Sequence, residues 1–184
     1  LIKDAEGLEL MEKVDTVVVD KTGTLTEGKP KVQQVIAVDG FERDHVVVLA
    51  AALEKSSEHP LAQAILAYLQ AQSLPLVTVQ NFTSITGKGV RGDIDGNAVL
   101  LGTSLLLQEA GIATAALDGK ADELRAMGQT VMFVAASGKL AGLISVADSI
   151  KPESREAIRM LHADGIKIVM LTGDNARTAK AVAA

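Results

Sequence analysis

Two hydrophobic patterns divide the chain. Near each end lies a short, largely apolar run, Val17–Val19 and Ile166–Leu171, and a polar segment follows each run directly. Runs of this kind predict strands that are buried on both faces of a parallel sheet. Between them, alternating positions and amphipathic stretches predict hairpins and helices. The pattern therefore indicates an α/β domain that is interrupted by an α+β segment.

Glycines, prolines and turn residues set the expected bounds of the elements. Helices are predicted at residues 3–14, 42–55, 60–72, 104–111, 118–127 and 152–163. Besides the two terminal runs, strands are predicted at residues 32–38, 77–82, 89–94, 98–101, 130–136 and 140–146. Hairpin turns are expected at Asp95-Gly96-Asn97 and at Ser137-Gly138.

A domain boundary is predicted near Gly28 and Pro30, where the strand pattern breaks. Residues 1–29 and 147–184 are then expected to form one α/β domain. Residues 30–146 would be an insertion into it, with an antiparallel sheet of its own.

Composition narrows the classes of protein that the chain can represent. Apolar residues make up 48% of the 184 residues and aromatic residues only 2%, so an aliphatic core is expected. The net charge of −5 argues against a nucleic-acid partner, which would require a basic surface. The sequence has no cysteine, which excludes disulfides and thiolate metal sites. Its longest apolar stretches are too short or too interrupted to cross a bilayer, and no signal peptide precedes them, so a soluble piece is expected.

Asp20 is the leading candidate for chemistry. It follows the first apolar run directly, and open α/β sheets bind their ligands outside the carboxyl ends of strands. A carboxylate at such a place can act as a nucleophile that accepts a phosphoryl group. Gly23 lets the backbone turn and expose amide groups to a phosphate. For an isolated aspartate, a capped turn would be the alternative.

The segment Asp20-Lys21-Thr22-Gly23-Thr24-Leu25-Thr26 resembles the phosphorylation signature of P-type ATPases. Residues 1–6, 11–14 and 27–30 resemble the heavy-metal-transporting branch, most of all its copper exporters. The resemblance extends over essentially the whole chain. It implies a haloacid dehalogenase-like, Rossmann-type phosphorylation domain that is truncated at its C-terminus, with an inserted α+β nucleotide-binding domain.

The same resemblance implies a place and partners for the chain. It would be the catalytic cytoplasmic loop of a pump in the bacterial plasma membrane, which uses ATP and Mg²⁺ to export copper(I). Zinc or another soft divalent ion is the alternative cargo. The metal ion would bind in membrane helices outside this chain, a metallochaperone would deliver it, and an actuator domain would complete the pump.

Thr172-Gly173-Asp174 follows the second apolar run and resembles the phosphate-contacting motif of this family. Its hydroxyl and its glycine amide suit phosphate oxygens. The resemblance implies that Lys21 and Thr24 join Asp20 in the catalytic segment, and that the Asp20 carboxylate and the Thr22 carbonyl hold Mg²⁺. Phosphatases of the superfamily carry an aspartate at the position of Thr22, and threonine cannot replace that acid and base. The aspartyl phosphate is therefore expected to persist, as a pump requires.

A second group of residues resembles the nucleotide-contacting positions of heavy-metal ATPases. An imidazole can lie against adenine, a carboxylate can accept a hydrogen bond from its amino group, and glycines let phosphates approach the backbone. The group consists of Glu58, His59, Gly87, Gly89, Gly102, Thr103, Asp148 and Lys151. Thr103 stands where the family has asparagine, so either a hydroxyl replaces the amide or this contact is absent.

Two other classes of protein remain as alternatives. A soluble phosphatase of the same superfamily is disfavoured by Thr22, and a non-catalytic ATP-binding module is disfavoured by the complete segment 20–26. The resemblance also implies that the chain stops before a Gly-Asp-Gly…Asn-Asp motif and a phosphate-contacting lysine. The isolated chain is therefore expected to bind ATP but to transfer phosphoryl groups poorly, and its phosphorylation half to be the less stable one.

Overall fold

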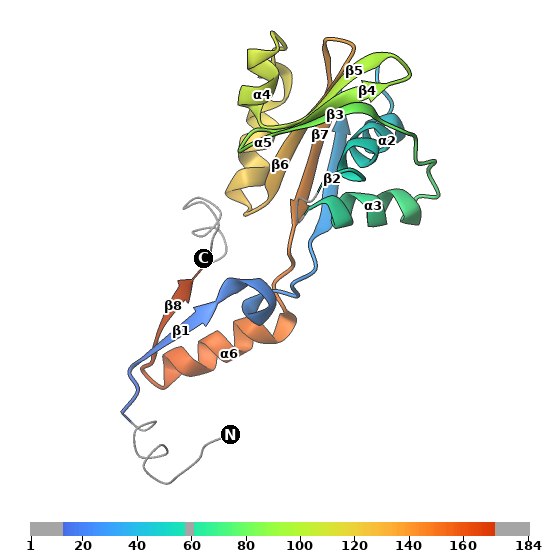
Figure 1. Ribbon diagram of the computed structural model, residues 1–184. Coiled ribbons are helices and arrows are strands. Elements are labelled where there is room, and N and C mark those ends of the chain that lie inside the picture. The colour runs from blue at the N-terminus through green and yellow to red at the C-terminus, as the bar shows by residue number, and fades with distance from the viewer. Residues whose placement is uncertain (1–12, 58–60, 172–184) are drawn as a thin grey trace. The chain divides into compact units, whose positions relative to one another are not determined.

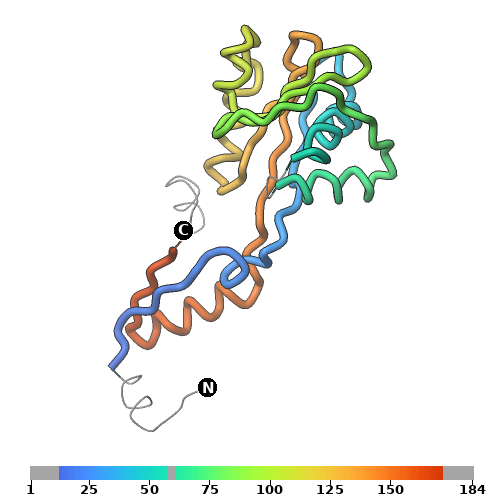
Figure 2. The backbone as a smooth tube through the Cα atoms, in the orientation of Figure 1, coloured from blue at the N-terminus to red at the C-terminus, as the bar shows by residue number. Residues whose placement is uncertain are grey.

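The computed structural model describes residues 13–57 and 61–171. These residues form two compact units (Figure 1). Unit 1 comprises residues 13–29 and 148–171, and unit 2 comprises the described residues of 30–147. The chain leaves unit 1 after Lys29 and returns to it at Asp148, a path that can be followed in Figure 2. The helix predicted at residues 3–14 lies almost entirely outside the described residues.

Unit 1 is built on a pair of parallel strands. β1 (Thr16–Asp20) lies beside β8 (Lys167–Leu171) in a register that pairs Val18 with Val169. The parallel pairing predicted from the two apolar runs is confirmed. The prediction of burial on both faces is wrong for this structure, because Val18 is 57% exposed and Val169 46% exposed. A two-stranded pair with one helix beside it, which is what the described part of unit 1 contains, leaves one face uncovered.

α6 (Pro152–Ala163) has the bounds predicted from the sequence. Its first residue is proline, whose fixed φ suits a helix start and whose missing N–H would have no helical partner there. Gly165, at φ +78°, ends the helix. Its amide donates to the carbonyl of His162, and the next amide donates to the carbonyl of Leu161. This pair of bonds is a Schellman motif, which turns the chain sharply from the helix into β8.

Unit 2 contains, among its described residues, a six-stranded antiparallel sheet in the order β2-β7-β6-β5-β4-β3. The strands are β2 (Lys31–Ala37), β3 (Gln80–Ile85), β4 (Gly89–Ile94), β5 (Asn97–Gly102), β6 (Thr130–Ala136) and β7 (Lys139–Ala147). The helices are α2 (Arg43–Glu54), α3 (Ala62–Ala71), α4 (Ser104–Glu109) and α5 (Ala115–Ala126). The α+β architecture with an antiparallel sheet is as predicted.

The central strand β6 is buried on both sides. Met132 and Val134 belong to the apolar cluster formed with α2 and α3, whereas Val131 and Phe133 belong to the cluster formed with α4 and α5. Because successive side chains of a strand point to opposite faces, this continuous apolar run requires a helix layer on each side of the sheet. Among the described residues, the buried hydrophobic side chains other than Met132 and Phe133 are Val, Leu, Ile and Ala. The expected aliphatic core is confirmed.

The strand predicted at residues 77–82 lies three residues further along the chain. β3 begins at Gln80 and ends at Ile85, which pairs with the first residue of β4. The amide of Lys88 donates to the carbonyl of Ile85 at 2.9 Å, and this tight turn fixes the register of the two strands. Val79, which the alternating pattern assigns to a strand, packs on the core from the segment before β3.

Asn97 is also placed differently from its prediction. It is the first residue of β5, and the turn before it consists of Asp95 and Gly96, both at positive φ. Two central residues at positive φ are what a type I′ hairpin turn requires. The side-chain oxygen of Asn97 accepts a hydrogen bond from the Ser137 hydroxyl at 2.9 Å, which joins two neighbouring hairpin tips.

Candidate functional site

The loop that follows β1 presents Asp20 at the carboxyl end of a strand. Asp20 is exposed, and its backbone is extended at φ −73° and ψ 142°. The five residues Lys21–Leu25 form a short helical turn that is interrupted at Thr22, with ψ 120°, and at Gly23, with φ 77°. The predicted turn at Gly23 is confirmed, since glycine adopts positive φ with little strain. We call residues 20–26 the Asp20 loop.

Thr26 ties this loop together from within. Its side chain is fully buried. The hydroxyl oxygen of Thr26 lies 3.1 Å from the carbonyl oxygen of Lys21 and 2.5 Å from a carboxylate oxygen of Asp148, and either of these oxygens can accept its proton. The same hydroxyl accepts the amide of Gly23 at 3.2 Å. The other carboxylate oxygen of Asp148 accepts the backbone amide of Lys29 at 3.1 Å. The Gly23 amide is thus engaged within the loop, so a phosphate would have to use other donors.

The start of α6 holds the same loop from the other side. The ammonium group of Lys151 donates to the carbonyl of Gly23 at 2.7 Å, and the hydroxyl of Ser154 donates to the carbonyl of Leu25 at 2.9 Å. The backbone amide of Lys151 donates to the carbonyl of Leu25 as well. Asp148 and Lys151, grouped from the sequence with the nucleotide-contacting residues, are therefore brought to the Asp20 loop within unit 1.

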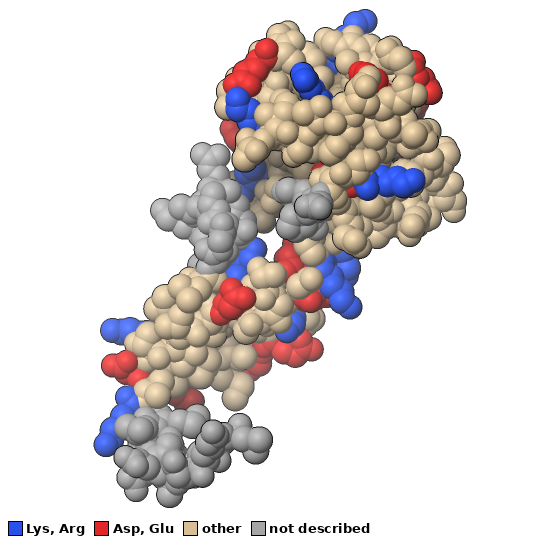
Figure 3. All heavy atoms as spheres, viewed as in Figure 1, with Lys and Arg blue, Asp and Glu red and all other residues tan. Residues whose placement is uncertain are grey.

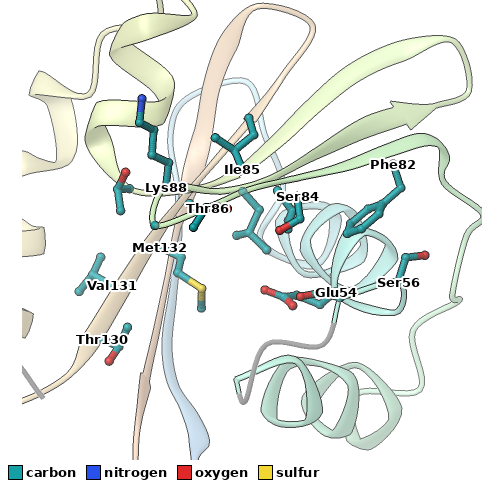
Figure 4. A pocket seen from close by; sticks show the side chains of 17 residues that line it. Glu54, Ser56, Phe82, Ser84, Ile85, Thr86, Lys88, Thr130, Val131 and Met132 are labelled. Atoms are coloured by element: carbon teal, nitrogen blue, oxygen red, sulfur yellow. The ribbon is translucent and has the colours of Figure 1, made fainter. Parts of the chain in front are cut away.

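Unit 2 contains a pocket of about 570 Å³ on its sheet (Figure 4). The end of α2, strand β3 and its turn, and parts of β4, β5 and β6 line it. Four of the residues singled out from the sequence line this pocket, namely Gly87, Gly89, Gly102 and Thr103. Tertiary structure thus gathers four of the predicted nucleotide-contacting residues around one cavity.

The surroundings of the three pocket glycines differ in whether they leave room for a side chain. Gly89 pairs with Gly102 across β4 and β5, and a Cβ added to Gly89 would lie 2.2 Å from the carbonyl oxygen of Leu101. A Cβ added to Gly102 would lie 2.2 Å from the carbonyl oxygen of Lys88. Neighbouring backbone, rather than a ligand, excludes side chains at these two positions. Gly87 instead has φ +72° with nothing within 4 Å of an added Cβ, so it leaves the turn open to a ligand.

Glu54 is a pocket residue that is absent from the set predicted from the sequence. It is the last residue of α2, lines the pocket and is only 3% exposed. Figure 4 shows its carboxylate and the side chain of Met132 turned toward the same space. Burying a carboxylate is costly, which makes Glu54 a further candidate for the functional site. The available sequence signal was an acidic residue that continues the apolar face ending at Leu53.

Thr103 also has a structural role in unit 2. It is the N-cap of α4, and its hydroxyl oxygen accepts the amide of Leu106 at 3.3 Å. The hydroxyl proton stays free for a further acceptor, because an N-cap uses only the oxygen as acceptor. Thr103 can therefore cap its helix and contact a ligand in the pocket at the same time.

Five of the predicted site residues lie outside the described residues. They are Glu58, His59, Thr172, Gly173 and Asp174. The two residues directly before Glu58, Ser56 and Ser57, do line the pocket of unit 2. Leu171, directly before Thr172, ends β8 beside Asp20 of β1 in the parallel pair.

The charged side chains and the helices of the described residues decide whether this part of the chain has a charged patch, a metal site or a membrane span. On the face seen in Figure 3, uncharged surface separates most basic side chains of unit 2 from one another. Within residues 13–57 and 61–171, no three side chains of the types His, Cys, Asp and Glu come together as a metal site. No helix in these same ranges has the length and apolar character to span a membrane.

Comparison with known proteins shows to which family the chain belongs. A family model for haloacid dehalogenase-like hydrolases matches residues 14–184. The chain belongs to this family. The haloacid dehalogenase-like fold class predicted from the resemblance is thereby confirmed, and the Asp20 loop lies at the first strand of the matched region.

Curated relatives that match the whole of this chain include P-type ATPases. The copper-transporting P-type ATPase of Rhizobium leguminosarum bv. viciae is 54% identical over 183 residues, which cover 100% of this chain and 22% of that protein. The copper-exporting P-type ATPase of Legionella pneumophila subsp. pneumophila is also 54% identical, over 100% of this chain and 25% of its own length. The predicted resemblance to heavy-metal P-type ATPases is confirmed, and the chain spans about a quarter of the length of these curated relatives.

Solved structures give the same result. The crystal structure of a zinc-transporting PIB-type ATPase matches with a TM-score of 0.82 and 37% identity, over 100% of this chain and 30% of that chain. The catalytic domain of the CPx-ATPase CopB-B, studied for its conformational changes upon nucleotide binding, matches with a TM-score of 0.68 and 28% identity. That match covers 98% of this chain and 61% of the other.

Proposed function

We propose that this chain is the ATP-binding and phosphoryl-accepting part of a heavy-metal P-type ATPase. The observation that carries the proposal is the Asp20 loop, where an exposed carboxylate stands at the end of a parallel strand. Asp148, Lys151 and Ser154 hold the loop behind it by side-chain bonds, and none of these bonds uses the Asp20 carboxylate. A nucleophile fixed in place but free to react is the requirement for covalent catalysis.

In the proposed reaction a carboxylate oxygen of Asp20 forms a bond to the γ-phosphorus of ATP, and the bond to the bridging oxygen of ADP breaks. The product is an acyl phosphate on Asp20 and free ADP. Lys21, Thr24 and the segment Thr172-Gly173-Asp174 would contact the transferred group. Their hydroxyls, amides and positive charge suit the charge that spreads over the phosphate oxygens.

Magnesium fits the oxygen donors of this loop. The exposed Asp20 carboxylate and the Thr22 carbonyl are hard ligands, and Mg²⁺ needs only one or two carboxylates when phosphates and water complete its shell. When bound, it would neutralise charge on the phosphates during transfer. The chain's own contribution is to keep the backbone of Thr22 extended beside Asp20. Two hydrogen bonds of the next residue support this conformation, since the Gly23 amide donates to the Thr26 hydroxyl and the Gly23 carbonyl accepts from Lys151.

ATP is proposed to bind in the pocket of unit 2. A carboxylate from Glu54 or Glu58 would accept a hydrogen bond from the adenine amino group, and His59 would lie against the ring. Gly87 would admit the phosphates to the open turn, Gly89 and Gly102 would shape the wall, and the Thr103 hydroxyl would replace the amide of the family's asparagine. Asp148 and Lys151 would contribute to nucleotide placement through the Asp20 loop, to which they are bound.

Thr22 favours a pump over a phosphatase, because no acid or base stands two residues after the nucleophile. Copper(I) is the proposed cargo, supported by 54% identity to copper-transporting ATPases. The likeness to a zinc-transporting ATPase supports zinc as the second candidate. The whole protein would lie in a bacterial plasma membrane with this chain on the cytoplasmic side, together with an actuator domain and a metallochaperone.

Radiolabelled ATP tests the proposal directly. Incubation of the full pump with [γ-³²P]ATP and Mg²⁺ should give an acid-stable protein label that hydroxylamine removes, as an acyl phosphate requires. A phosphatase would instead hydrolyse phosphate esters without accumulating label. A binding module would retain nucleotide and show neither activity. Either of the last two results would overturn the proposed function.

A further inference from the structure

The turn between β3 and β4 carries a lysine in the middle of its two glycines. Lys88 stands between Gly87 and Gly89 and lines the pocket of unit 2. Among the described residues of the pocket wall, it is the one that carries a positive charge. A cation at this position is well placed to act on a polyanionic ligand, because the open side of the turn is at Gly87.

The backbone at Lys88 is held by hydrogen bonds through both its amide and its carbonyl. The amide of Lys88 donates to the carbonyl of Ile85 at 2.9 Å, and its carbonyl accepts the amide of Thr103 at 2.8 Å. The close approach of Gly89 and Gly102 holds the next residue of the strand. The ammonium group, at the end of a flexible stem, is therefore the part of Lys88 that can change partner.

In this structure the ammonium group is paired with Glu109. It lies 2.6 Å from one carboxylate oxygen of Glu109 and 2.7 Å from the other. The side chain of Lys88 is 33% exposed and that of Glu109 is 50% exposed, so water screens the pair and exchanging it for another anion costs little. Figure 4 shows Lys88 extending away from the other labelled side chains of the pocket.

We propose that Lys88 reads the number of phosphates on the bound nucleotide, exchanging Glu109 for the terminal phosphates of ATP. This inference rests on the proposed function, because it deepens nucleotide binding at the same pocket. Glu109 is then a competing anion that holds the lysine when no triphosphate is present. The preference of the site for ATP over AMP comes largely from Lys88, while adenine recognition by the rest of the pocket is independent of it.

Calorimetric titration of the 184-residue chain with ATP, ADP, AMP and adenosine tests this exchange. Lys88→Met should lower the affinity for ATP about tenfold, since it removes a charge-assisted hydrogen bond. It should leave the affinities for AMP and adenosine within about twofold, and it should weaken the dependence of ATP binding on salt. Glu109→Gln should raise the affinity for ATP about threefold, since it removes the competitor of a solvent-exposed pair.

Matched controls come from α5, where Lys120 and Glu123 form an ion pair at 2.8 Å. Lys120→Met and Glu123→Gln change the same charges and should leave all four affinities unaltered. Lys88→Arg should keep the preference for ATP and shows that the position tolerates substitution. Equal losses for ATP and AMP in Lys88→Met, or no loss for ATP, would overturn the role of Lys88. If the unsubstituted chain binds none of the four ligands, the proposed nucleotide site itself is wrong, and this inference falls with it.

Discussion

Gly89 and Gly102 each occupy the space that a side chain on the other would need. A Cβ on Gly89 would lie 2.6 Å from the Cα of Gly102, and a Cβ on Gly102 would lie 2.8 Å from the Cα of Gly89. The two residues pair directly across β4 and β5. The two glycines therefore let two strands approach closely at the wall of the pocket. Beside them, the amide nitrogen of Thr103 lies 2.8 Å from the carbonyl oxygen of Lys88.

Gly102→Ala should destabilise unit 2. The added methyl group meets backbone that cannot move as a flexible side chain can, so a loss of about 1–3 kcal/mol in the free energy of unfolding is expected. Urea denaturation followed by circular dichroism measures it. Gly119→Ala in α5 is the control, because an added Cβ there meets nothing within 4 Å and alanine favours a helix. Equal stability of the Gly102→Ala chain and the unsubstituted chain would contradict the close approach.

Gly87→Ala should lower both the affinity for ATP and the free energy of unfolding. At φ +72°, alanine costs about 1–2 kcal/mol in backbone strain. Gly138, at φ +73° in the turn between β6 and β7, has the same conformation and the same empty surroundings but does not line the pocket. Gly138→Ala should thus show a similar loss of stability with unchanged ATP affinity by calorimetry. If both variants bind ATP alike, Gly87 does not take part in nucleotide binding.

Asp20→Asn should abolish the acid-stable phosphoenzyme of the intact pump while sparing ATP binding. The amide has nearly the same shape as the carboxylate but is a far poorer nucleophile. ATP affinity can rise, because one negative charge near the triphosphate is removed. Asp15→Asn, just before the opposite end of β1, is the control and should label as the unsubstituted pump does. Labelling of Asp20→Asn at the unsubstituted level would refute the assignment of Asp20.

Thr26→Val should loosen the Asp20 loop, because it removes the Thr26 hydroxyl while keeping a side chain of nearly the same size. The substitution leaves the amide of Gly23 without its acceptor and the Asp148 carboxylate without its buried donor, a loss of about 1–3 kcal/mol. Faster amide hydrogen exchange is expected in residues 20–27, with unchanged exchange in β6 of unit 2. Thr83→Val is the control, since Thr83 is exposed on β3. Unchanged exchange in residues 20–27 would show that Thr26 does not hold the loop.

His59→Ala should weaken ATP binding by about 1–3 kcal/mol, as expected for loss of a ring stacked on a base. His59 lies outside the described residues, and the expectation rests on its sequence motif and on the pocket-lining residues Ser56 and Ser57 before it. Calorimetry of ATP binding measures the effect, with His162→Ala in α6 as the control. An unchanged dissociation constant would remove His59 from the pocket.

The sequence alone predicted the local elements and indicated the chemistry that we propose for Asp20. The bounds of α6 follow from Pro152 and Gly165, and the hairpin between β6 and β7 follows from Ser137-Gly138, because caps and turns depend on neighbouring residues. The segment 20–26 indicated a phosphoryl acceptor because its residue types and spacing are specific. All of these signals lie within a few residues of the feature that they predict.

Only the tertiary structure decided which distant residues meet. Asp148 reaches Thr26 across 122 residues and so belongs with the Asp20 loop. Glu54 lines the pocket because α2 packs on the sheet. The alternating pattern of residues 77–82 predicted an earlier strand, but pairing with β4 begins only at Gln80. Gly89 and Gly102 are explained by each other rather than by a ligand. The physical reason is that such contacts depend on strand register and on the approach of backbones far apart in the chain, which local periodicity does not encode.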